Sequence, residues 1–165
     1  MIAVKTIIFT LLLPGVFLVL VPCFLLSSFG GRFAVDIGRI RTIGLIPMLF
    51  GVFMYIRCVW SFATLGKGTP APTDPPEKLV VQGMYKYARN PMYIGVLFIL
   101  IGEAIFFASL LLSIYAVLVF MCFHLFVVIY EEPALRAKFG GSYRKYCDSV
   151  PRWIPRMKKE KKRKK

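Results

Sequence analysis

Two stretches of the chain, about 40 residues apart, carry the side chains best suited to bind a small charged ligand. The first, Gly83 to Gly95, holds tyrosines, basic residues and the step Asn90-Pro91; the second is the acidic pair Glu131-Glu132. Asn can cap a helix and Pro suits its first turn, so a helix starting there would offer free backbone N–H groups to a carboxylate. The acidic pair suits an ammonium group and the tyrosines suit a flat ring. These residues favour a zwitterion attached to an aromatic ring, and a juxtamembrane turn with snorkelling Lys and Tyr is the alternative.

Three further ionisable groups interrupt apolar segments, where a charge is costly and therefore indicates function. They are Arg57, Glu103 and His124. Counted from the predicted helix ends that face the ligand site, all three lie roughly 10–15 Å deep at about 1.5 Å per residue. We therefore expect them to meet in one leaflet. An Arg57–Glu103 ion pair that only holds helices together, and a His124 that only forms an interhelical hydrogen bond, are the open alternatives.

The composition places these groups in a membrane protein. Of the 165 residues 58% are hydrophobic and 18% charged, with a mean hydropathy of +0.67, whereas soluble domains have about a quarter charged residues. A disordered chain is excluded and a soluble enzyme is disfavoured. The net charge of +14 is concentrated in residues 156–165, which hold eight Lys or Arg and one Glu.

Four apolar runs predict an all-α integral membrane fold, since only helices and closed barrels satisfy the backbone in lipid. Residues 7–29 and 43–65 are each 23 residues long, enough to cross a core of about 30 Å. A secretory signal is the alternative for the first run. Residues 93–130 are too long for one crossing and predict a helical hairpin, with spans at about 92–108 and 110–130 and a turn near Ala108–Ser109.

The segments outside the spans complete the predicted organisation of this single domain. Residues 66–92 hold five prolines and cannot cross the membrane. Glu131-Glu132-Pro133 predicts a new helix start, with a stop at Gly140-Gly141 and interfacial tyrosines at Tyr143 and Tyr146. Residues 131–155 form a cytoplasmic segment that covers the site. The basic tail 156–165 predicts a cytoplasmic C-terminus on anionic lipids, with both termini on that side and nucleic acid disfavoured.

The motifs around the two stretches resemble the isoprenylcysteine carboxyl methyltransferase family, which is similar in turn to small phospholipid N-methyltransferases. The resemblance covers about residues 57–156, or about 60% of the chain. The matching series comprises Gly83-x-Tyr85-x-x-x-Arg89-Asn90-Pro91-x-Tyr93-x-Gly95, Glu131-Glu132-x-x-Leu135, Phe139-Gly140-x-x-Tyr143-x-x-Tyr146 and Val150-Pro151.

The resemblance implies methyl transfer from S-adenosylmethionine to a lipid-like or prenylated substrate, with carboxyl O-methylation favoured and no metal. Arg57 would face the substrate carboxylate; an amine substrate would instead need a base, for which Glu103 and His124 are the candidates. The implied setting is a multi-pass protein of the bacterial inner membrane or endoplasmic reticulum, with its site facing the cytoplasm. The residues implied to bind the methyl donor are Leu79, Val80, Tyr85, Asn90, Pro91, Met92, Tyr93 and Glu131.

Two positions depart from the family's pattern. Asn90 stands where the family usually has His, which excludes a protonation role near neutral pH, and Val127 stands where prenylcysteine enzymes place an Arg. His124, one turn earlier, could replace that arginine. Three alternatives stay open: a phospholipid-type amine N-methyltransferase, a nicotinamide-dependent reductase similar to membrane sterol reductases, and a non-catalytic membrane scaffold.

Overall fold

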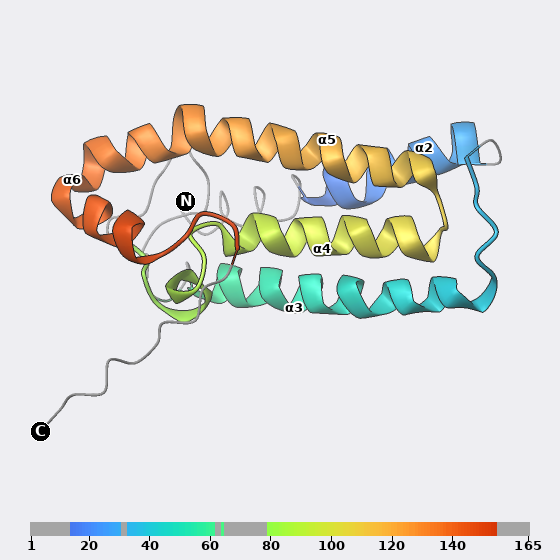
Figure 1. The fold of residues 1–165 in the computed structure, drawn as a ribbon, viewed down its shortest axis with the longest axis horizontal. Helices are drawn as coiled ribbons and strands as arrows, with labels where there is room; N and C mark the ends of the chain where they lie inside the picture. Colours follow the sequence, from blue (N-terminus) through green and yellow to red (C-terminus); the bar gives the residue numbers. More distant parts are fainter. Residues whose placement is uncertain (1–13, 31–32, 62–63, 65–78, 155–165) are drawn as a thin grey trace, which may run out of the picture.

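The computed structural model describes residues 14–30, 33–61, 64 and 79–154, and every regular element in these ranges is a helix. Three long helices lie side by side along the molecule, and a fourth turns back across one end of them (Figure 1). The elements in chain order are η1 (Val16–Leu20), α2 (Val21–Phe29), η3 (Gly38–Gly44), α3 (Leu45–Ser61), η5 (Gly83–Lys86), α4 (Pro91–Phe106), α5 (Leu110–Phe126), η6 (Val127–Glu131) and α6 (Glu132–Ser149).

Two helical segments are long and apolar enough to cross a membrane. They are Gly38–Ser61 and the long helix that begins at Leu110, whose apolar part ends at Tyr130. Val16–Phe29 and Pro91–Phe106 are apolar but shorter. The all-helical prediction is confirmed for the described residues, and the four-crossing arrangement stays a prediction. Residues 7–13 of the first predicted span, residues 65–78 and the tail 156–165 lie outside the described residues.

Glycines bring α3 and α4 into backbone contact. A Cβ added to Gly102 would collide with the Met48 side chain and lie 2.6 Å from the carbonyl oxygen of Gly44. A Cβ on Gly51 would likewise overlap the backbone of Gly95. Close approach through small residues is the usual way apolar helices pack in lipid, where dispersion forces replace the hydrophobic effect. This contact fixes the start of α4 relative to α3.

Replacing Gly102 with alanine should therefore destabilise the fold. The added methyl group meets backbone as well as a side chain, so we expect a loss of about 1–3 kcal/mol in the free energy of unfolding. Gly141→Ala is the matched control, because nothing lies within 4 Å of a Cβ there. Thermal unfolding of both variants in detergent measures the difference, and equal midpoints would contradict the close packing.

The hairpin turn between α4 and α5 lies where the sequence predicts it. Ala108 adopts a positive φ of 48°, and the Ser109 hydroxyl oxygen accepts a hydrogen bond from the Leu112 N–H at 3.4 Å. The Ser109 N–H also donates to the Ala104 carbonyl at 3.0 Å. Ala108 itself takes the left-handed conformation, at a cost of about 1–2 kcal/mol, so the turn is made without a glycine.

The predicted helix start at Glu131-Glu132-Pro133 is wrong. Glu131 and Glu132 have helical backbone angles, and α5 continues into α6 through the π-helical turn η6. Pro133 lacks the N–H that would bond the carbonyl four residues earlier, and a π-turn absorbs such a gap by widening the helix locally. The long helix therefore carries the acidic pair directly past the end of the apolar segment.

The helix predicted to stop at Gly140-Gly141 is interrupted at Gly140 but does not end there. Gly140 has φ 52° and ψ −123°, and a further helical stretch follows to Ser149. This stretch turns back toward the start of α4 (Figure 1). Tyr143 and Tyr146 are consequently buried in a small core with Val150, rather than interfacial as predicted.

Candidate functional site

The start of α4 and the α5–α6 junction meet at one end of the helices. The Tyr93 hydroxyl donates a hydrogen bond to Glu131 Oε2 at 3.0 Å. Arg89 Nη1 donates to Glu132 Oε1 at 2.9 Å. The prediction that the hairpin brings the stretch around Asn90 face to face with the acidic pair is confirmed.

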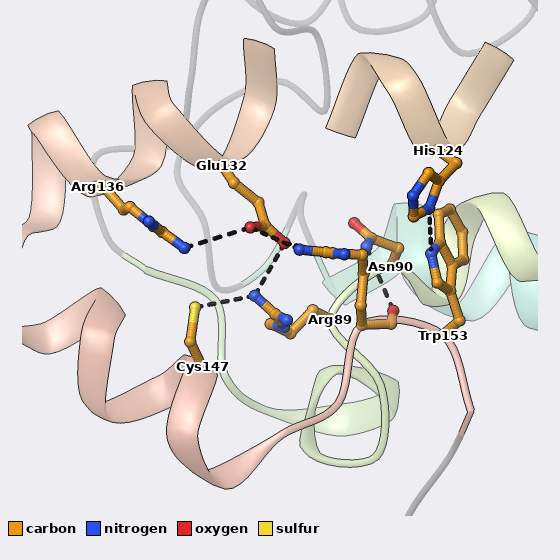
Figure 2. Close-up of polar contacts among 8 residues, drawn as sticks. Arg89, Asn90, His124, Glu132, Arg136, Cys147 and Trp153 are labelled. Atoms are coloured by element: carbon orange, nitrogen blue, oxygen red, sulfur yellow. Dashed lines mark hydrogen bonds and ion pairs between the residues drawn. The ribbon is translucent and has the colours of Figure 1, made fainter. Parts of the chain in front are cut away.

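Glu132 is the centre of a buried charge cluster. Besides Arg89, it accepts hydrogen bonds from Arg152, with Nε to Oε1 at 2.7 Å and Nη2 to Oε2 at 3.1 Å (Figure 2). Arg136 approaches at 3.6 Å from the exposed side, and Arg89 also donates to Cys147 Sγ at 3.0 Å. Glu132 is only 4% exposed. A carboxylate removed from water in this way is stabilised by the paired, hydrogen-bonded guanidinium groups.

Residues 150–154, which we call the C-terminal strap, lie across this end of the helices. The Arg89 N–H donates to the Pro151 carbonyl at 2.9 Å. The Asn90 N–H and Nδ2 both donate to the Arg152 carbonyl at 3.3 Å. Asn90 therefore holds the strap through its side chain as well as its backbone, a role for which neutral Asn is sufficient.

The strap also contacts His124 on α5. The Trp153 indole Nε1–H donates to His124 Nδ1 at 3.1 Å (Figure 2). The indole ring lies 5.3 Å from the ring of Phe120 and 6.5 Å from that of Tyr93, centroid to centroid. Arg152 and Trp153 belong to the site although the sequence did not predict them as members; the motif Val150-Pro151 immediately before them is the signal that points to them.

Glu131 has an environment opposite to that of Glu132. It lies just beyond the apolar part of the long helix, and burial raises the pKa of its carboxyl group, as does the neighbouring Glu132, while the hydrogen bond from Tyr93 opposes this. Within the described part of the chain its second oxygen, Oε1, has no hydrogen-bond partner. A desolvated carboxylate with a free acceptor favours a cationic or hydroxyl-bearing ligand.

The other predicted donor-binding residues lie at the same end. Val80 and Tyr85 are buried together in a cluster that includes Cys58 and contacts Met92. The Tyr85 carbonyl accepts a hydrogen bond from the Tyr146 hydroxyl at 2.7 Å. Pro91 is fully buried at the start of α4, and Leu79 packs against the Tyr143–Tyr146 core. Together with Asn90, Tyr93 and Glu131, described above, all eight predicted donor-binding residues thus lie at one end of the helices.

A family model described as phospholipid methyltransferase matches residues 40–142, which include all of α3, α4 and α5 and the acidic pair. The chain belongs to this family. The family match ends before the C-terminal strap, so the contacts of Arg152 and Trp153 lie outside it. Val127, the family position discussed above, is 1% exposed and packed inside the helices.

Two curated relatives have names that state the same activity. The chain is 32% identical over 78 residues to Protein-S-isoprenylcysteine O-methyltransferase B of Arabidopsis thaliana, covering 47% of this chain and 40% of the relative. It is 32% identical over 77 residues to Protein-S-isoprenylcysteine O-methyltransferase of Schizosaccharomyces pombe, covering 47% and 33%. The match therefore spans well under half of each relative.

The expected meeting of Arg57 with Glu103 does not occur. Gly102, next to Glu103, packs against Gly44 and Met48, whereas Gly95 packs against Met54 and Tyr55. Arg57 thus lies beyond the level of Gly95, about 14 Å along the axis from Met48 at about 1.5 Å per residue. The depth count failed because α3 spans Leu45–Ser61, whereas the predicted span runs to residue 65. Arg57 therefore lies about 6 Å from the site end of its helix, whereas Glu103 lies about 18 Å from Pro91, at about 1.5 Å per residue.

The surroundings of these two residues differ as well. Arg57 is exposed at the site end of α3. Glu103 is 7% exposed, and its buried Oε2 has no hydrogen-bond partner among the residues that the structure describes. Of the three predicted catalytic residues, His124 alone is linked to a predicted donor-binding residue in the described structure. The link is indirect: Trp153 bonds His124, and its ring lies 6.5 Å from that of Tyr93.

The pairing of Glu132 should make stability depend on pH. Burial alone would raise the pKa of Glu132, but the hydrogen bond from Arg152 and the charges of Arg89, Arg152 and Arg136 outweigh it, so the pKa lies below its usual 4.5. Because the folded-state pKa is the lower one, the pairing stabilises above about pH 4.5 and is lost as pH falls through the folded pKa.

We therefore expect the difference in unfolding free energy between wild type and Glu132→Gln to be constant near neutral pH. It should shrink below about pH 4.5, where the wild-type carboxylate also becomes neutral. Denaturant unfolding in micelles at several pH values measures it. If the difference in unfolding free energy instead grew toward acid pH, the pKa of Glu132 would not be lowered in the folded state.

Proposed function

We propose that the chain catalyses methyl transfer from S-adenosylmethionine to a lipid-like, prenylcysteine-type substrate, with a carboxylate oxygen as the acceptor. The observation that carries the proposal is the contact between the two ligand-binding stretches, Tyr93 with Glu131 at 3.0 Å and Arg89 with Glu132 at 2.9 Å. Family membership supports methyl transfer. The names of the two relatives, both isoprenylcysteine O-methyltransferases, support the carboxylate acceptor.

The residues at this site fit the chemistry of the donor. Glu131 offers a free, desolvated acceptor oxygen that suits an ammonium group or a ribose hydroxyl. The buried Nε–H of Arg89 has no acceptor in the described part of the chain, so this end of the site can donate a further hydrogen bond to a carboxylate. Val80, Tyr85 and Met92 supply an apolar and aromatic wall suited to adenine.

The chain's contribution to the reaction is alignment. When bound, S-adenosylmethionine supplies a methyl group already activated on a positively charged sulfur. Holding the two reactants in line accelerates such a transfer without a metal or a triad, and an apolar, water-poor surrounding strengthens every electrostatic interaction in it. Arg57, at the site end of α3, is the candidate to orient the acceptor carboxylate, whereas Glu103 is at the other end of α4 and is not proposed to act there.

We place this site at the cytoplasmic mouth of a four-crossing membrane domain. Spans at about 7–29, 43–65, 92–108 and 110–130 would return both termini to one side, and residues 131–155 would cover the donor. The basic residues of 156–165 support a cytoplasmic position by the excess of Lys and Arg on that side. The lipid tail of the substrate would enter sideways between helices.

A phospholipid amine is the second candidate acceptor, because the family description names phospholipids. The two acceptors differ in the product that they give. A carboxyl methyl ester is hydrolysed by base, whereas a methylated amine is stable to it.

The test is radiolabelled methyl transfer from S-adenosylmethionine into total membrane lipid and protein, using protein purified in detergent. Base-labile label in the product would support the carboxylate acceptor, and base-stable label in a lipid headgroup would support the amine. No incorporation by a folded sample that also fails to bind the donor would overturn the proposed function.

A further inference from the structure

The hydrogen bond between Trp153 and His124 fixes where the imidazole carries its proton. An indole N–H can only donate, so His124 Nδ1, at 3.1 Å, must be the unprotonated acceptor. A neutral imidazole has one N–H, and the bond made at one nitrogen decides that it sits on the other. His124 is therefore an Nε2–H donor.

The strap holds the indole in this position. The Trp153 ring lies 5.3 Å from the ring of Phe120, 6.1 Å from that of His124 and 6.5 Å from that of Tyr93, centroid to centroid. Its neighbour Arg152 is tied to Glu132 by two hydrogen bonds, and the Arg152 carbonyl accepts from Asn90. Trp153 cannot swing away without breaking this clamp, so the imidazole tautomer is set by the same contacts that close the site.

The Nε2–H of His124 has no acceptor among the described residues, and the side chain is half-buried. In this tautomer the imidazole has no free lone pair, so it cannot take a proton from an amine. A protonated amine, in turn, offers no lone pair to an N–H donor. The free donor suits an oxygen acceptor, above all a carboxylate.

We propose that Trp153 is a positioning residue that holds His124 as an Nε2–H donor to the carboxylate of the lipid-like substrate. The inference deepens the proposed function and rests on it. In the transfer, a carboxylate lone pair forms the new O–CH₃ bond while the S–CH₃ bond breaks and its electron pair returns to sulfur. No proton moves in this transfer, so the reaction does not need a base, and His124 as an Nε2–H donor could not act as one.

The first test reads the tautomer directly. His124 is the one histidine of the 165 residues, so ¹⁵N-histidine labelling of protein purified without a histidine tag reports on it alone. At about pH 8.5, where an ordinary histidine is neutral, wild type should show an unprotonated Nδ1 and a protonated Nε2. Trp153→Phe keeps the ring but loses the N–H, and should show averaged tautomers. A protonated Nδ1 in wild type, or averaging identical to the variant, would overturn the inference.

The second test asks whether the His124 Nε2–H donates a hydrogen bond to the substrate carboxylate. We expect S-farnesylcysteine to shift the Nε2 resonance and its carboxyl methyl ester, whose carbonyl is uncharged, to shift it much less. Phosphatidylethanolamine, whose phosphate oxygens can also accept from an N–H, is the comparison for a phospholipid-type acceptor. In methyl transfer, His124→Phe should raise KM for S-farnesylcysteine about tenfold, whereas His124→Gln, which keeps an N–H donor, should restore most of it. Both variants are compared only if their thermal midpoints match wild type; Trp153→Phe supplies a third comparison if one fails to fold.

The outcomes separate the two claims. Methyl transfer to S-farnesylcysteine with an unchanged KM in His124→Phe and Trp153→Phe would overturn the role of His124 and leave the proposed function standing. A shift of the resonance by phosphatidylethanolamine instead would overturn the carboxylate assignment. A fixed tautomer in a protein that transfers no methyl group would overturn the proposed function, and with it the substrate half of the inference.

Discussion

Replacing Glu132 with alanine is expected to lower the free energy of unfolding by about 3–5 kcal/mol, because breaking a buried ion pair leaves its partners charged and unpaired. Glu132 is 4% exposed and receives hydrogen bonds from both Arg89 and Arg152. Its removal should also loosen the strap, since the Arg152 side chain loses its two hydrogen bonds, while the bonds of Arg89 to Pro151 and of Trp153 to His124 remain. Thermal or denaturant unfolding in detergent measures the first effect.

Arg136→Ala is the control for this variant. Arg136 touches the same carboxylate, but at 3.6 Å and with a side chain that is 59% exposed. Exposed pairs of this kind contribute about 0–1 kcal/mol, so the control should remain near wild type. Equal losses in the two variants would show that the buried cluster does not carry the stability assigned to it.

Replacing Glu131 with glutamine should weaken binding of S-adenosylmethionine, or of its demethylated product, by about 10- to 150-fold. Hydrogen bonds to charged groups contribute about 1.5–3 kcal/mol, and each 1.4 kcal/mol is a factor of about ten in affinity. The amide oxygen of glutamine can still accept from the Tyr93 hydroxyl, so the contact at 3.0 Å is retained while the charge is lost. Isothermal titration in detergent measures both affinities.

Asp148→Asn makes the same carboxylate-to-amide change at an exposed position of α6, beyond the break at Gly140, and should bind the donor as wild type does. Because both variants lose one negative charge, comparing their affinities separates the role of Glu131 from the effect of net charge on binding. Wild-type affinity in Glu131→Gln, with the fold intact, would count against Glu131 as a donor-binding residue.

The meeting of the two ligand-binding stretches could be predicted because it depends only on topology. A hairpin of two crossings returns the chain to the side from which it left, wherever the turn lies in detail. The turn at Ala108–Ser109 was also predictable, from the length of the apolar run. The relative level of Arg57 and Glu103 was not, because it depends on where each helix begins and on the glycine contacts that set the register of α3 against α4.

The strap could not be predicted for a different reason. Its contacts join residues 20, 29 and 62 positions apart, from Arg152 to Glu132, Trp153 to His124 and Asn90 to Arg152. No local pattern reports such pairings. The break at Gly140 was visible, but the direction of the chain after it follows from the burial of Tyr143 and Tyr146, which only the folded state shows.

The strap also dictates an order of events during biosynthesis. Synthesis proceeds from the N-terminus, so α4 and α5 leave the ribosome before Arg152 and Trp153 do. Until those two residues emerge, Glu132 has only Arg89 and Arg136 beside it, and the imidazole of His124 has no indole partner. We therefore expect the contacts of Glu132 and His124 with the strap to form after the contacts between α4 and α5.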